Sequence, residues 1–214
     1  MRLPEQWGSF RGIEGLPHII VLSNALVYVF DLFRPGLIND LLLIPSLVHA
    51  GEWWRLVTFL FVPPPLPQAW PFLWLAVWLL VLHNVATALE NAWGSFRFTL
   101  YFFSGAAATM LTAVLPWPVV ITNGWLQASL FLAFATLFPD EIFLLFFIVP
   151  LRAKWLAVFT AAGMAWAFLT GGLVTRIVVA ASLVNFFLLL GPGLWERARM
   201  WRDVRRNRRR WPGE

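Results

Sequence analysis

The sequence contains no cysteine, which excludes disulfides, cysteine-ligated metal sites and thiol nucleophiles. Charged residues are also scarce: they make up 13% of the 214 residues, against about 25% in an average soluble protein. The first fifteen residues lack the apolar run of a secretory signal peptide, so we expect the first retained helix to drive insertion.

Apolar residues are correspondingly abundant, at 60% of the chain. Fourteen tryptophans and twenty phenylalanines add the aromatic rings that membrane proteins place at the level of the lipid headgroups. The length allows one compact domain. The composition therefore predicts an all-α membrane protein.

Six apolar stretches have roughly the 17–25 residues that a helix needs to cross a bilayer. They cover residues 17–33, 70–92, 96–115, 121–138, 152–171 and 173–194. Glycine or proline separates several of them and ends helices there. We expect a six-transmembrane-helix bundle over residues 16–194, with a short cytoplasmic N-terminus (1–15) and an Arg-rich cytoplasmic tail (195–214).

Two long stretches do not span. Residues 34–69 carry prolines at several positions and only short apolar pieces, which predicts a long interfacial first loop of short amphipathic helices or a re-entrant loop. Residues 139–151 contain the apolar run 142–149, which ends at Pro150. We expect this second stretch to be an interfacial loop on the cytoplasmic side.

The net charge of +5 lies entirely in the tail, which contains eight arginines and three acidic residues. If both termini are cytoplasmic, the inside carries thirteen basic residues and the outside only Arg34, Arg55 and Arg176. The positive-inside rule then favours this orientation. Without a cleavable address or a Lys-rich retrieval signal, a bacterial inner membrane is the preferred location.

Three short motifs occur in order along the chain: Trp54-Arg55, the stretch from Glu90 through Gly94 to Arg97, and Leu137-Phe138-Pro139. Together with the six spans, they resemble the rhomboid-like superfamily, which contains intramembrane serine proteases and inactive relatives such as the derlins. The five donors of Arg55 suit a role in tying loop carbonyls together. We expect the Glu90 carboxylate to accept from Arg97 or from N–H groups at the start of the next helix.

The resemblance also locates the catalytic positions of an active rhomboid protease, and they are not retained. The serine position falls on Gly124 and the histidine position on Ser182, while the oxyanion positions fall near Trp74 and Trp78. A serine nucleophile needs an imidazole beside it, and no histidine follows His83. The resemblance therefore implies a derlin-type pseudoprotease in which Trp74 and Trp78, one turn apart on the same face, fill the catalytic cleft.

From this resemblance we expect a catalytically inactive protein that binds transmembrane segments of client proteins between its second and fifth helices. Its role would lie in membrane-protein quality control, trafficking or adaptor function. The tail is expected to bind anionic lipids or a cytoplasmic ATPase or protease through Arg205, Arg206, Arg208, Arg209 and Arg210. We expect no metal, cofactor or nucleic acid, and the oligomeric state stays open.

Two alternatives remain open from the sequence. One is an intramembrane serine protease with an unusual dyad, in which His83 serves Ser129 or Ser104. The other is a small-solute transporter, which is disfavoured because the spans carry few charges and no paired acidic residues.

Overall fold

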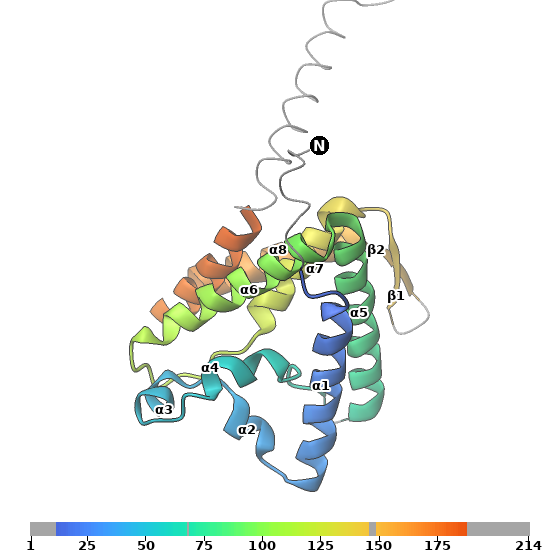
Figure 1. Cartoon of the computed structure of the whole chain (residues 1–214). Helices are drawn as coiled ribbons and strands as arrows, with labels where there is room; N and C mark the ends of the chain where they lie inside the picture. The colour runs from blue at the N-terminus through green and yellow to red at the C-terminus, as the bar shows by residue number, and fades with distance from the viewer. Residues whose placement is uncertain (1–11, 68, 146–148, 188–214) are drawn as a thin grey trace, which may run out of the picture.

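The computed structural model describes residues 12–67, 69–145 and 149–187, with the side chains of residues 144, 145 and 149 left aside. This part of the chain is mostly helical (Figure 1). The long elements are α1 (Leu16–Phe33), α5 (Pro71–Trp93), α6 (Ser95–Leu111), α7 (Gly124–Leu137), α8 (Ala153–Thr170) and a last helical segment, Leu173–Phe187. Helices therefore lie in all six of the places where the sequence predicts spans.

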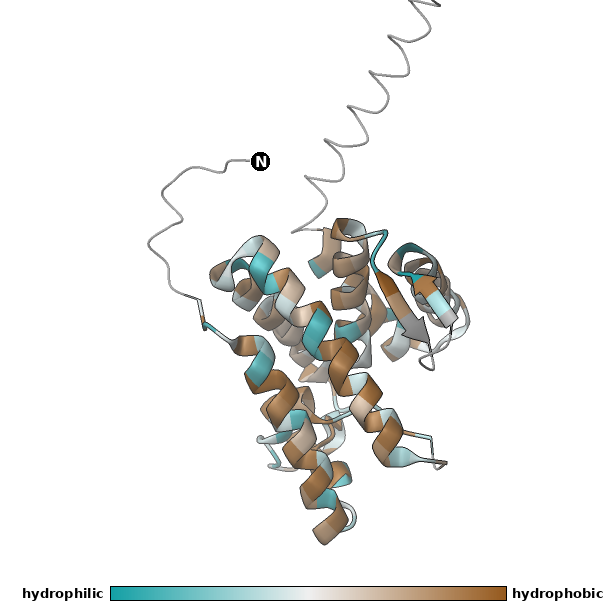
Figure 2. Cartoon of the chain, turned by 90° about the vertical axis from the view of Figure 1, so that its right-hand side faces the viewer, coloured by the Kyte–Doolittle hydropathy of each residue, from teal (hydrophilic) through white to brown (hydrophobic). Residues whose placement is uncertain are grey.

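The predicted number of six spans is not matched by helix length. Among the described residues, α1, α5 and α8 are long and apolar enough to cross a membrane, whereas α7 and Leu173–Phe187 are shorter apolar helices. Figure 2 shows hydrophobic residues along much of α1 and α5. The structure thus supports a membrane protein with three helices of spanning length.

Burial is distributed unevenly among the helices. Half of the fourteen residues of α7 are buried, whereas Ala153 and Met164 alone are buried in the eighteen-residue α8. Helix α7 packs against α5, α6 and α8, and α1 packs along α5. Helix α7 is therefore the core helix, while α8 presents an apolar surface outward.

The turn between α5 and α6 consists of a single residue, Gly94. It ends one helix and begins the next with φ 84° and ψ 155°, a conformation that is essentially restricted to glycine. The glycine in this motif is therefore required by the backbone.

The first loop contains short helices, as the sequence predicts. They are α2 (Leu37–Leu41), α3 (Pro45–His49), α4 (Arg55–Thr58) and the 3₁₀ helix η2 (Phe59–Phe61). The buried Asn123, just before α7, donates from its side-chain amide to the carbonyls of Leu60 (2.9 Å) and Val62 (3.1 Å). The first loop is thereby attached to the start of the core helix. A second 3₁₀ helix, η3 (Thr112–Val114), follows α6.

The prediction of an all-α fold with a plain loop over residues 139–151 is wrong at one place. This stretch forms an antiparallel hairpin of β1 (Ile142–Leu145) and β2 (Val149–Arg152), in which Ile142 pairs with Arg152. A hairpin satisfies backbone N–H and C=O groups by pairing, which matters where water is scarce. The Phe143 ring anchors it, with centroids 5.8 Å from Phe131 and 5.6 Å from Phe134.

Candidate functional site

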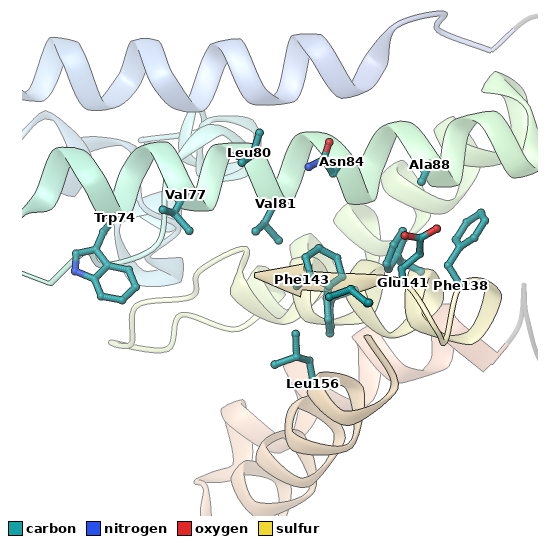
Figure 3. Close-up of a pocket in the computed structure, with 13 residues that line it drawn as sticks. Trp74, Val77, Leu80, Val81, Asn84, Ala88, Phe138, Glu141, Phe143 and Leu156 are labelled. Atoms are coloured by element: carbon teal, nitrogen blue, oxygen red, sulfur yellow. The ribbon is translucent and has the colours of Figure 1, made fainter. Parts of the chain in front are cut away.

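A cavity of about 620 Å³ lies between α5, α7, the hairpin and α8 (Figure 3). Its walls are mostly aliphatic and aromatic. The lining residues are Trp74, Val77, Leu80, Val81, Asn84 and Ala88 from α5, Phe131, Phe134 and Phe138 from α7 and its end, Glu141, Ile142 and Phe143 from the hairpin region, and Leu156 from α8. Its volume and apolar lining are in the range of small-molecule pockets.

The aromatic wall of the cavity is well packed. The Phe134 ring lies 5.2 Å from the Phe138 ring and 6.4 Å from the Phe131 ring, measured between centroids. Phe131 and Phe134 also contact the Phe143 ring, so this wall joins α7 to the hairpin. The side chains of α5 form the adjoining wall.

Two polar side chains line the cavity, Asn84 and Glu141. Neither makes a side-chain hydrogen bond or ion pair within the described part of the chain. The adjacent Asp140 instead takes both nearby cations, with Lys154 Nζ at 3.1 Å and Arg152 Nη1 at 3.4 Å. The Glu141 carboxylate is therefore the acidic group that remains available at the cavity.

The four positions that the rhomboid resemblance predicts as catalytic lie on three elements, α5, α7 and the last helical segment. Gly124 is the first residue of α7, and Ser182 is buried in the last helical segment, donating to its own helix at Val178 O (3.1 Å). Trp74 lines the cavity, whereas Trp78 packs against the hydrophobic core. Of the two tryptophans, Trp74 lines this cavity and Trp78 does not, and the expectation that both fill a catalytic cleft stays a prediction.

The alternative dyads are not formed among the described residues. Ser129 is fully buried, donates to Leu126 O (2.8 Å) and accepts from the Tyr101 hydroxyl (3.1 Å). Ser104 donates to Asn185 Oδ1 (2.7 Å). The His83 ring lies against the His18 ring of α1, 5.0 Å away and edge-on. Both hydroxyls are thus engaged with partners other than an imidazole.

The Trp-Arg motif has the structural role that its donors predict. Arg55 is 4% exposed and donates to Asn39 O (2.7 Å), Leu42 O (2.9 Å) and Glu52 Oε2 (2.6 Å). The neighbouring Trp54 is exposed and donates from its indole to Asp40 O (3.3 Å). The motif therefore fixes α2 to α4 within the first loop.

The second motif joins different elements from those expected. The Glu90 carboxylate accepts from Gly15 N (3.1 Å), which precedes α1, and not from Arg97 or from the start of α6. Arg97 is exposed. The physical reason is the lateral packing of α1 against α5, which places the uncapped start of α1 beside Glu90.

Two structural features were not predicted from the sequence. The first is the hairpin, whose only sequence signal is a short apolar run of Phe, Ile, Leu and Val before Pro150. The second is Asn185, which bonds Ser104 and donates to Tyr101 O (2.9 Å), and so ties the last helical segment to α6. No local pattern marks this residue.

The tail residues Arg205, Arg206, Arg208, Arg209 and Arg210 lie outside the described residues. Within the described part, no group of three or more His, Cys, Asp or Glu side chains is arranged to hold a metal ion. No family model, no curated protein and no solved structure matches this chain.

Proposed function

We propose that this protein is a rhomboid-like membrane protein that holds a transmembrane segment of another protein beside α5 without cleaving it. The observation that carries the proposal is the apolar cavity between α5, the hairpin and α8. Helices α5 and α8 lie at the places of the second and fifth predicted spans. The family resemblance implies that a client enters between these two spans.

A membrane location for this cavity is supported by the surface around it. Large apolar side chains are exposed along α8, including Phe159, Trp166 and Leu169, which are between 68% and 71% exposed. Soluble proteins rarely leave a contiguous apolar surface of this kind to water. Lipid hydrocarbon is the solvent that suits it, and a client helix would exchange lipid contacts for contacts with the cavity walls.

In this proposal all six long helical elements cross or enter the bilayer, with both termini on the cytoplasmic side of a bacterial inner membrane. The short core helix α7 is compatible with this arrangement, because neighbouring helices shield half of its residues from lipid. Its fourteen residues span about 21 Å, less than the roughly 30 Å hydrocarbon core. Local thinning of the bilayer would therefore favour entry of a client.

The environment of the serines supports the non-cleaving part of this proposal. A nucleophilic serine requires an accessible hydroxyl and an adjacent base. Ser129 and Ser182 are both buried and bonded to backbone carbonyls, and position 124 has no hydroxyl at all. Solute transport is disfavoured because the cavity offers one carboxylate and one amide among apolar groups.

A non-cleaving protein of this kind would act in membrane-protein quality control, trafficking or as an adaptor. The Arg-rich tail would then bind anionic lipid or recruit a cytoplasmic ATPase or protease. The resemblance to derlin-type proteins is the support for this part of the proposal.

The test is photo-crosslinking in cells. A photoreactive phenylalanine analogue replaces Trp74 in the cavity, and in a matched control it replaces Trp166, which is exposed on α8 away from the cavity. We expect adducts with intact membrane proteins at position 74 and few at position 166. Equal labelling at both positions would refute cavity binding, and adducts that end inside a transmembrane segment would show that the protein is an enzyme.

A further inference from the structure

The α5 wall of the cavity has the residue spacing of a helix-packing seam. The lining positions Trp74, Val77, Val81, Asn84 and Ala88 are separated by three, four, three and four residues. This is the heptad spacing that keeps one face of a helix against a partner helix. Along α5 the seam is about 21 Å long, which is close to four helical turns.

The α7 side of the cavity has a similar spacing. Phe131, Phe134 and Phe138 follow one another at intervals of three and four residues. Because α7 packs directly against α5, these rings form the base of the cavity, and an occupant would lie along the α5 seam between α5 and α8. A helix crossing α5 at about 20° would fit such rows, whereas a compact solute would touch only part of them.

The charge at one end of this seam adds a chemical requirement. Figure 3 shows the Glu141 carboxylate on the side of the cavity that faces α5, near Ala88. Arg152 at the end of β2 and Lys154 in the first turn of α8 both pair with Asp140, so Glu141 has no cation of its own among the described residues. An occupant with a basic group at this end would supply one.

Glu141 also lies at a particular end of the molecule. The start of α1, the end of α5 and the start of the hairpin lie towards the same end in Figure 1, opposite the first loop. With the orientation proposed above, this is the cytoplasmic end. Transmembrane segments carry their excess of Lys and Arg on that side.

We propose that the cavity selects a transmembrane helix that carries a lysine or arginine at its cytoplasmic end, and that Glu141 pairs with this residue while the α5 seam packs against the helix. This inference rests on the proposed function and adds a class of client to it. The Arg-rich tail of the same chain (residues 195–214) is the competing occupant that the experiment must exclude.

The experiment uses the full chain in phosphatidylcholine vesicles with synthetic helices of about 21 Leu and Ala residues. The helices are flanked at both ends by Lys, by Gln or by Asp, so that their orientation does not matter. Because the chain has no cysteine, T170C at the end of α8 carries a single dye for energy transfer to a labelled peptide.

We expect the Lys-flanked helix to bind roughly three- to fivefold more tightly than the Gln-flanked one, as for a partly exposed ion pair. Glu141→Gln should remove this difference, and Glu141→Lys should shift the preference to the Asp-flanked helix. The matched control is Glu14→Gln, which removes an exposed carboxylate that does not line the cavity and should keep the preference.

The outcomes separate this inference from the proposed function. Binding that ignores the flanking charge but is blocked by Val81→Trp leaves helix binding in place and overturns the role of Glu141. Binding of none of the three peptides, by a protein whose thermal unfolding is normal, overturns both. A photo-crosslink from position 141 to residues 195–214 would show that the tail occupies the site, and would also overturn this inference.

Discussion

Replacing Arg55 by alanine should destabilise the protein strongly, although the residue is far from the cavity. Its guanidinium donates to two carbonyls and one carboxylate at 2.6–2.9 Å, and it is 4% exposed. At about 1 kcal/mol net for each hydrogen bond, the loss amounts to about 3 kcal/mol of unfolding free energy. Arg55→Lys should lose about half of this, because an ammonium cannot reproduce the planar fork.

The assay is equilibrium unfolding in detergent micelles, followed by tryptophan fluorescence. The matched control is Arg34→Ala, whose ion pair with Asp40 (2.9 Å) has side chains 72% and 52% exposed, and which should cost less than about 1 kcal/mol. If Arg55→Ala and Arg34→Ala shift the unfolding midpoint equally, the argument that Arg55 holds the first loop together is wrong.

Three further predictions concern backbone and packing. Gly94→Ala forces a side chain onto a backbone with φ 84° and should cost about 1–3 kcal/mol in the same unfolding assay, whereas an unchanged midpoint would show that the turn relaxes. Gly105→Ala brings a methyl group into Leu126 and within 2.8 Å of Asn185 Nδ2, so we expect a loss of about 1–3 kcal/mol and altered protection of the last helical segment in hydrogen exchange. Ser129→Ala removes a hydroxyl that is bonded to the Tyr101 hydroxyl, and it should lower the free energy of unfolding by only about 0.6 kcal/mol. Client adducts at the cavity should not change. Loss of a proteolytic activity in this variant would instead identify Ser129 as a nucleophile.

The role of a motif residue was predictable from the sequence where its side chain bonds to the loop that contains it. Arg55 is an example, because its donors, the prolines around it and the shortage of water together leave few partners except loop carbonyls. Glu90 is the opposite case. Its partner Gly15 is 75 residues away, and nothing local indicates that the start of α1 lies beside the end of α5.

The sequence by itself determined where the helices lie. Helix positions follow from apolar length and from glycine and proline, which act within a few residues. Only the tertiary structure decided that residues 142–152 pair as a hairpin, and that Trp74 lines the cavity while Trp78 packs against the core. It also decided that Asp140 pairs with both nearby cations and leaves the Glu141 carboxylate without one. These outcomes depend on contacts between segments that are distant in the chain. The packing of α5, α7 and α8 determines which side chains become neighbours, and the local sequence does not indicate this.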